Sequence, residues 1–246
     1  MRAREFFERF ILTRKCPVCG ELLSYDDRKE AFCAECRMRW DVLKTRECKR
    51  CGRAMCECIC MTKALSDSGA LCHHKLVAYS ATDSVVHNTV SFIKRNENER
   101  ISSFLAEQLY LVLCADKDLT PLDAESFVIT FVPRGRRAVL KYGVDQSREL
   151  ALALSKISGI PFAETTKRLQ GGKEQKKLTA AERRKNVKKL FAAAEDIEAS
   201  VGGKTVILID DVVTTGASMS AAVYHLIRAR ASAVICLSVA STPENK

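Results

Sequence analysis

The sequence changes its hydrophobic period within one short stretch, residues 206–218. Val206 to Ile209 are apolar and mostly β-branched, and they follow the turn signal Gly202-Gly203-Lys204. This is typical of a central strand in a parallel sheet covered on both faces. From Ala217 to Arg230 the apolar residues recur at spacings of three and four, which indicates a helix. The stretch therefore predicts an α/β fold with a ligand site at the carboxyl end of this strand.

The turn between strand and helix has the residue types of a ribose 5-phosphate site. Hydroxyl groups, a glycine and the free amides of a helix N-terminus suit a phosphate. The residues assigned to this ligand are Val213, Thr214, Thr215, Gly216, Ala217 and Ser218. Asp210 and Asp211 would repel a phosphate, so they suit the hydroxyls of a ribose, directly or through Mg²⁺. These two acids are the candidate catalytic residues.

Residues 206–218 resemble, over all thirteen positions, the phosphoribosyl pyrophosphate (PRPP) motif of the type I phosphoribosyltransferases. The resemblance implies a doubly wound, mostly parallel sheet and a PRPP site that uses Mg²⁺. In that family a second loop holds the pyrophosphate of PRPP. Its counterpart here follows a strand predicted over 127–132, and it offers charge and close backbone approach. It consists of Pro133, Arg134, Gly135 and Arg136.

Cysteines dominate the N-terminal quarter of the chain, where nine of the twelve lie between Cys16 and Cys60. The first residues carry acids where a signal peptide needs an apolar core, so metal binding is favoured over disulfides. Paired C-x₂-C spacings suit tetrahedral Zn²⁺. The predicted ligands are Cys16, Cys19, Cys33 and Cys36 for one ion, and Cys48 and Cys51 with two of Cys56, Cys58 and Cys60 for another. His73 and His74, next to Cys72, are not assigned to zinc.

The zinc is expected to be structural, because about fifty residues with few apolar groups cannot hold themselves together by burial alone. We predict a helix and double zinc ribbon over 1–64, a linker over 65–75 and a phosphoribosyltransferase-like domain over 76–246. Within that domain we expect strands at 76–79 and 127–132, with helices at 84–95, 101–114 and 145–158. Alternating strands and helices indicate a doubly wound parallel sheet.

The net charge of +10 lies in one segment. Residues 134–189 hold 16 Lys and Arg against 5 Asp and Glu, whereas the remainder holds 24 against 25. Such a segment suits the phosphates of single-stranded DNA. The candidate contacts are Lys176, Lys177, Arg183, Arg184, Lys188 and Lys189, and the candidate stacking residues are Trp40, Tyr142 and Phe162. Residues 167–189 are also typical of a flap over the site, and a solvated helix from Thr179 to Phe191 is an equally good interpretation of the second half of that stretch.

The order of these parts resembles the ComF competence family. The resemblance rests on the paired cysteines, Phe92-Ile93-Lys94, Val132-Pro133, residues 143–147, the spaced Arg168, Gln175, Arg184, Asn186 and Phe191, and the PRPP stretch. It implies a helicase-like partner and the uptake of single-stranded DNA. The chain departs from the family at Tyr142, where an arginine is usual, and in its extra cysteine.

Two functions remain open at this point. One is a ComF-like protein that binds PRPP and Mg²⁺ and acts in DNA uptake or related DNA metabolism. The alternative is an active phosphoribosyltransferase that passes ribose 5-phosphate to an unknown acceptor. No run reaches the roughly eighteen apolar residues of a membrane helix, so we expect a cytoplasmic protein without membrane insertion.

Overall fold

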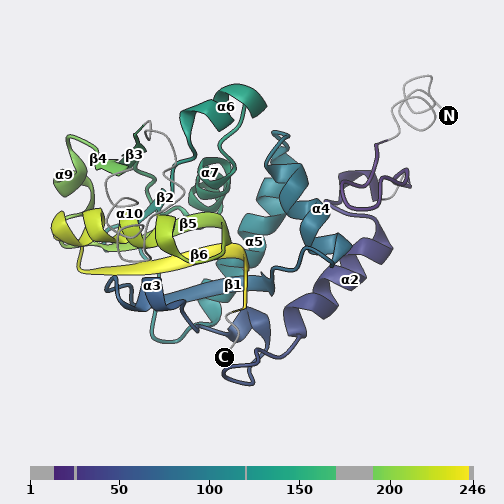
Figure 1. The fold of residues 1–246 in the computed structure, drawn as a ribbon, viewed down its shortest axis with the longest axis horizontal. Helices are drawn as coiled ribbons and strands as arrows, with labels where there is room; N and C mark the ends of the chain where they lie inside the picture. The colour runs from purple at the N-terminus through teal and green to yellow at the C-terminus, as the bar shows by residue number, and fades with distance from the viewer. Residues whose placement is uncertain (1–13, 25–26, 120, 170–190, 244–246) are drawn as a thin grey trace, which may run out of the picture.

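A four-stranded parallel sheet forms the centre of the protein (Figure 1). The computed structural model describes residues 14–24, 27–119, 121–169 and 191–243. The strand order is β1-β6-β5-β2, with β1 at Cys72–Ala78, β2 at Phe127–Phe131, β5 at Thr205–Val213 and β6 at Ala233–Ser241. Parallel neighbours need crossover connections, and helices provide them. The predicted doubly wound α/β fold is confirmed.

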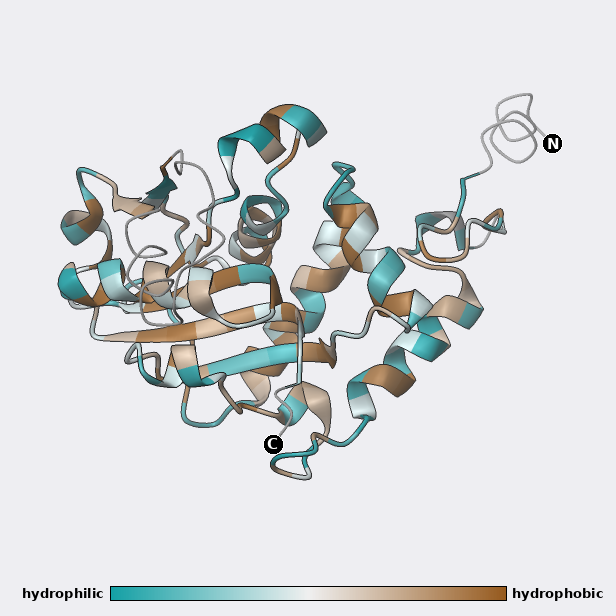
Figure 2. Cartoon of the chain, viewed as in Figure 1, coloured by the Kyte–Doolittle hydropathy of each residue, from teal (hydrophilic) through white to brown (hydrophobic). Residues whose placement is uncertain are grey.

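Helices cover both faces of this sheet. One face packs against α4 (Ser84–Ile93), α5 (Glu99–Ala115) and α7 (Gln146–Ser158), and the other against α3 (Lys63–Ser66), α9 (Ile197–Val201) and α10 (Ala217–Arg228). Side chains of β5 alternate between the two cores, with Ile207 and Ile209 in one and Val206 and Leu208 in the other. Figure 2 shows hydrophobic colour along β6, whereas much of the edge strand β1 has the hydrophilic colour. A short helix, α6 (Arg136–Tyr142), buries no residue.

The sheet continues beyond β2 by one parallel bridge between Ile129 and Phe162. The N–H of Ile129 donates to the carbonyl of Pro161 at 2.8 Å, and the N–H of Ala163 donates to the carbonyl of Ile129 at 2.9 Å. Phe162 also stacks on Phe131 at 5.9 Å between ring centroids. Its ring therefore belongs to the packing of this sheet edge.

Two short strands form an antiparallel pair, β3 (Thr166–Arg168) and β4 (Phe191–Ala193). Residues 170–190 between them lie outside the described residues, and so do most of the flap predicted over 167–189 and most of the predicted helix from Thr179. Phe191, the expected end of that helix, is instead the first residue of β4. The N-terminal helix was predicted over residues 1–15, of which 1–13 also lie outside the described part.

The cysteine-rich segment packs directly on the helices of the sheet. It contains η1 (Asp27–Lys29), α2 (Ala34–Thr45) and η2 (Met55–Glu57). The rings of Phe32 and Trp40 lie 5.7 Å apart, and Phe104 of α5 lies 5.2 Å from Phe32 and 6.5 Å from Trp40. Trp40 is fully buried in this aromatic cluster. The proposal of Trp40 as a base-stacking platform is therefore wrong.

The edge strand β1 begins at Cys72, four residues before the predicted start at Leu76. Polar residues hid it in the sequence, and two of them find polar partners in the structure. Nε2 of His73 lies 2.8 Å from Oγ of Ser238, and Nζ of Lys75 donates to the carbonyl of Cys60 at 2.6 Å. Leu65, in the segment expected to be a linker, is buried beneath α10. The described cysteine-rich segment and the sheet share one continuous core.

Candidate functional site

Two adjacent carboxylates lie near the carboxyl end of β5, as the sequence predicts. Oδ1 of Asp210 accepts hydrogen bonds from Oγ of Ser147 at 3.0 Å and from the N–H of Asp211 at 2.9 Å. Burial raises the pKa of Asp210 well above its ordinary value, and the neighbouring Asp211 carboxyl raises it further. A cation or a hydroxyl donor beside Asp210 would stabilise its ionised form.

Asp211 is buried and already has a cationic partner. Its Oδ2 lies 3.3 Å from Nζ of Lys94, the residue that follows α4. The Lys94 side chain is 38% exposed, so its ammonium group stands at the border between the acid pair and solvent. Lys94 and Ser147 were not predicted as site residues. Both lie in the short stretches on which the family resemblance rests. Those stretches were the sequence feature that could have identified them as site residues.

The turn after β5 presents an uncapped helix N-terminus. Gly216 is the N-cap of α10, has a left-handed backbone (φ 74°) and makes no side-chain capping bond. Thr214 and Thr215 are exposed, and Oγ1 of Thr215 accepts from the N–H of Ala217 at 3.4 Å. The remaining first-turn amides of a helix have no intrahelical acceptor. The turn therefore suits an anion.

Gly216 is also the point where the turn touches the end of the cysteine-rich segment. A Cβ built on Gly216 would collide with Oγ1 of Thr62 and would lie 3.1 Å from Cγ of Leu65. Thr62 is buried and caps α3 by accepting from the N–H of Leu65 at 3.4 Å. Only a glycine fits this position, both for its backbone angle and for its space.

In the predicted pyrophosphate loop, residues 133–136, Arg134 contacts the protein itself and does not face solvent as a free cation. The guanidinium of Arg134 donates to the carbonyl of Lys94 at 2.7 Å, to the carbonyl of Val144 at 3.2 Å and to Oε1 of Gln146 at 2.9 Å. Arg134 therefore joins three segments around the site. Pro133 is buried, whereas Arg136 is exposed, and a Cβ built on Gly135 would lie 3.8 Å from the side chain of Arg168. In this loop Arg136 is the cation that faces solvent.

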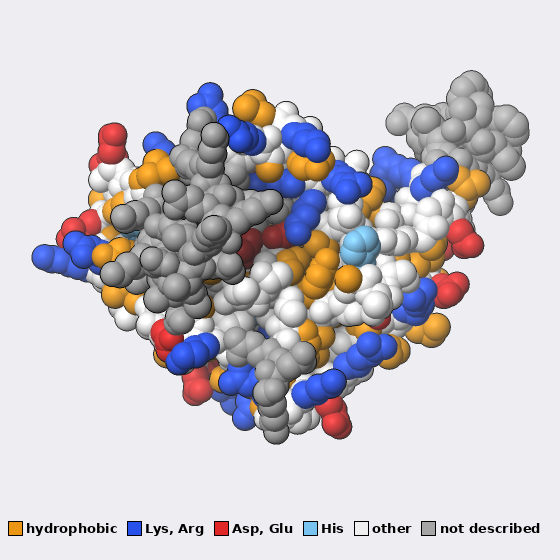
Figure 3. Space-filling model, in the orientation of Figure 1, with side chains coloured by type: hydrophobic (Ala, Val, Ile, Leu, Met, Phe, Trp, Pro, Cys, Tyr) orange, Lys and Arg blue, Asp and Glu red, His pale blue; other side chains and the backbone are white. Residues whose placement is uncertain are grey.

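Asp145 fixes the same loop from the other side. Its Oδ2 accepts from the N–H of Arg134 at 2.7 Å, and its side chain also caps α7. Burial raises the pKa of Asp145, although the amide of Arg134 acts in the opposite direction. Figure 3 shows acidic side chains recessed at the centre of one face with basic side chains beside them. The site thus combines opposite charges at one edge of the sheet.

The first cysteine cluster fits a tetrahedral metal ion. The thiols of Cys16, Cys19, Cys33 and Cys36 lie within 4.8 Å of one another. The Sγ atoms of Cys19 and Cys33 are 3.7 Å apart, close to the spacing of about 3.8 Å that follows from Zn–S bonds of about 2.3 Å in a tetrahedron. The N–H of Cys33 also points at Sγ of Cys16 at 3.5 Å. The donor set is that of a structural zinc site.

The second cluster contains Cys48, Cys51, Cys58 and Cys60, again within 4.8 Å of one another. Cys56 lies outside it, so the structure selects two of the three candidates that the sequence left open. Burial raises the pKa of Cys58 to about 12, and the nearby Lys75 acts against this. Burial acts in the same way on Cys48, but hydrogen bonds from the backbone of Arg50 and Cys51 outweigh it and bring its pKa to about 6.

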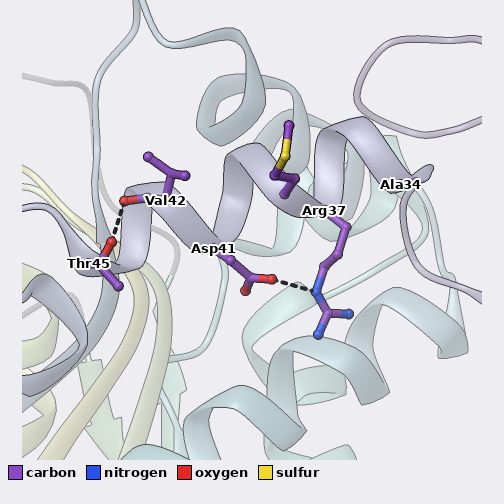
Figure 4. A pocket seen from close by; sticks show the side chains of 6 residues that line it. Ala34, Arg37, Asp41, Val42 and Thr45 are labelled. Atoms are coloured by element: carbon purple, nitrogen blue, oxygen red, sulfur yellow. Dashed lines mark hydrogen bonds and ion pairs between the residues drawn. The ribbon is translucent and has the colours of Figure 1, made fainter.

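An apolar depression lies on α2. Figure 4 shows the side chains that line it, which are Ala34, Arg37, Met38, Asp41, Val42 and Thr45. An ion pair between Arg37 and Asp41, 3.2 Å long, crosses it. None of the predicted ligand-binding or metal-binding residues lines this depression.

The six basic residues predicted to contact DNA lie within 170–190, outside the described residues. Tyr142 lies under the guanidinium of Arg134, 4.9 Å from its ring centroid. Among the described helices, none is both long and apolar enough to span a bilayer.

Residues 138–246 match the sequence profile of the phosphoribosyl transferase domain. The chain is also similar to the DNA utilization protein YhgH of Escherichia coli O157:H7, at 29% identity over 157 residues. That region covers 63% of this chain and 66% of that protein, slightly less than two thirds of its length.

Two solved structures show a weaker likeness, each over 62% of this chain. The first is the allosteric regulatory enzyme of purine biosynthesis, with 19% identity, a TM-score of 0.41 and 30% of its chain covered. The second is the adenine phosphoribosyltransferase of Leishmania tarentolae, with 15% identity, a TM-score of 0.36 and 74% covered. The fold assignment rests on the strand order and on the domain match.

The sheet, the turn and the domain match together define a phosphoribosyltransferase-type domain, preceded by two four-cysteine clusters that fit a zinc ribbon. This combination and the similarity to the DNA utilization protein agree with the predicted resemblance to the ComF family.

Proposed function

We propose that the protein binds PRPP together with Mg²⁺ at the carboxyl end of β5. The observation that carries this proposal is the acid pair Asp210 and Asp211 in front of the uncapped N-terminus of α10. The phosphate would lie on the amides and hydroxyls of Thr214–Ser218. The carboxylates would accept from the ribose hydroxyls or hold the metal.

Lys94 and Arg136 are the cations that support a pyrophosphate in this proposal. Lys94 lies 3.3 Å from Asp211, and its partly exposed side chain has room to turn toward a bound anion. Arg136 is exposed at the start of α6. Arg134 would act indirectly, because its guanidinium already has three acceptors in the loops around the site.

Calorimetric titration of PRPP, with and without Mg²⁺, tests the proposal. The double variant Asp210→Asn, Asp211→Asn should bind PRPP and Mg²⁺ at least tenfold more weakly. A matched control is Glu195→Gln with Asp196→Asn, an exposed acid pair before α9 that removes the same charge. Equal affinity of the double variant and the control would contradict the proposal.

We further propose that this PRPP-binding protein acts in DNA uptake or related DNA metabolism, with single-stranded DNA and a helicase-like protein as partners. Support comes from the similarity to a protein named for DNA utilization and from the charge excess in residues 134–189. Replacing Lys176, Lys177, Arg183, Arg184, Lys188 and Lys189 with Gln should weaken DNA binding and flatten its salt dependence. Each lost contact should lower the log–log slope by about 0.7.

Active transfer of ribose 5-phosphate is the second candidate, and the match to a phosphoribosyl transferase domain favours it. The groups around the site would act mainly by holding the ligand and stabilising charge on the departing pyrophosphate. Release of pyrophosphate from PRPP and Mg²⁺, tested with and without added bases, separates the candidates. A binding protein should release none, whereas an enzyme should do so only with its acceptor.

A further inference from the structure

Three metal-ligating side chains meet at the start of β1, far along the chain from the PRPP turn. Cys72 and His74 are two residues apart on one strand and therefore point to the same face. Asp116 immediately follows α5 and approaches them from the helix layer. The Sγ, imidazole nitrogen and carboxylate oxygen all lie within 4.8 Å of one another.

The contact between His74 and Asp116 has the spacing of two ligands on one ion. Nε2 of His74 lies 3.1 Å from Oδ2 of Asp116. Even so, Nε2 is buried and has no hydrogen-bond partner of proper geometry among the described residues. In a tetrahedral zinc site with bonds of about 2.0–2.1 Å, a nitrogen and an oxygen ligand lie about 3.3 Å apart. The observed pair is within a few tenths of an ångström of that spacing.

The neighbouring His73 has the hydrogen-bond partner that is usual for a buried imidazole. His73 points to the opposite face, where its Nε2 lies 2.8 Å from Oγ of Ser238. His74 instead faces a thiol and a carboxylate. Cys72 and His74 are buried, whereas the Asp116 side chain is 19% exposed. An ion and a solvent ligand can therefore reach these three side chains from the side of Asp116.

We propose that Cys72, His74 and Asp116 form a third metal site, separate from both four-cysteine clusters. One sulfur, one imidazole and one carboxylate suit a divalent ion of intermediate softness, with Zn²⁺ as the first candidate. Three protein ligands leave a fourth position for water or another small ligand. The site lies at the amino end of β1, whereas the acid pair lies near the carboxyl end of the parallel strand β5.

Native mass spectrometry of the full chain, loaded with Zn²⁺ under reducing conditions, counts the ions directly. The wild-type chain should hold three zinc ions and Cys72→Ala two. The matched control is Cys114→Ala, which removes an exposed thiol of α5 two residues before Asp116 and should keep three. Two ions in the wild type, or three in the Cys72 variant, would overturn the proposal.

The partly exposed Asp116 supplies a second test if Cys72→Ala does not fold. Asp116→Asn should keep the two cluster ions, which reports an intact fold, and should weaken binding of the third at least tenfold. Co²⁺ is the probe for the ligand set, since its visible bands respond to the number of thiolates. The third equivalent should give a weaker thiolate band than the two cluster equivalents. Unchanged third-ion affinity in Asp116→Asn would also contradict the site.

Discussion

At the scale of single residues, the burial of Asp210 beside Asp211 carries a cost in stability. Burial and Asp211 raise its pKa, so the folded protein holds the ionised form unfavourably. Stability is retained below the ordinary pKa of an aspartate and falls as the pH rises toward the raised value. Asp210→Asn should therefore raise the Tm of the ligand-free protein near neutral pH, by about 2–4 °C for each 1 kcal/mol.

Thermal unfolding at several pH values measures this effect. The gain should vanish in acid, where the carboxyl is neutral in both folded and unfolded chains. Asp211→Asn is the matched comparison, because it removes the ion pair with Lys94 and should lower the Tm instead. A lower Tm for Asp210→Asn at neutral pH would show that this carboxylate stabilises the free protein.

A comparison of Gly216 with another glycine separates the backbone penalty of a left-handed residue from the steric effect of an added Cβ. Gly203 has a similar left-handed backbone (φ 71°), but a Cβ there would meet nothing within 4 Å. Gly203→Ala should cost only the backbone penalty of about 1 kcal/mol. Gly216→Ala adds a collision with Thr62 and should cost more, and it should also weaken PRPP binding. Urea denaturation of both variants gives the difference, and equal losses would contradict the close contact.

At the scale of elements, the second cysteine cluster gives a sharp test of ligand choice. Cys58→Ser removes a thiol of the cluster and should lose one zinc ion per chain, whereas Cys56→Ser should lose none. Cys56 lies within η2 and Cys58 is the C-cap of the same short helix, so the two variants are closely matched. Metal analysis after gel filtration decides. Loss of zinc from the Cys56 variant would mean that the cluster uses a different thiol.

The sequence predicted the elements whose apolar periods are regular, such as β5 and α10, but not β6 or the helix α2 of the cysteine-rich segment. It missed the start of β1, since His73 and Lys75 find partners that only the folded neighbours provide. The acid pair and the turn were recognisable because they are contiguous. Lys94 and Ser147 come from separate helices, and only the fold brings them to Asp211 and Asp210.

At the scale of the whole molecule, the described cysteine-rich segment and the sheet should unfold together. Phe104 of α5 is buried against Phe32 and Trp40, so Phe104→Ala should cost about 3–5 kcal/mol. Leu111→Ala, on an exposed position of the same helix, should stay within about 0.5 kcal/mol. Urea denaturation gives both values.

Cooperativity is directly measurable, because Trp40 is the only tryptophan of the chain and lies in the cysteine-rich segment. Its fluorescence should change at the same urea concentration as the far-ultraviolet circular dichroism of the whole protein. An earlier fluorescence transition would mean that the cysteine-rich segment unfolds by itself, as a division into separate domains implies. The sequence could not settle this point, since contacts between distant segments leave no periodic pattern.

The contact between Gly216 and Thr62 has a practical consequence for anyone who divides the chain. A fragment that starts at residue 76 would contain the whole PRPP motif and would still lack one wall of its turn, because Thr62 and Leu65 would be missing. It would also lose the first four residues of an edge strand and leave hydrogen-bonding groups of β6 bare. Such a fragment would aggregate or bind poorly for reasons unrelated to its chemistry. The smallest fragment suitable for expression, grafting or comparison between relatives therefore includes part of the cysteine-rich segment.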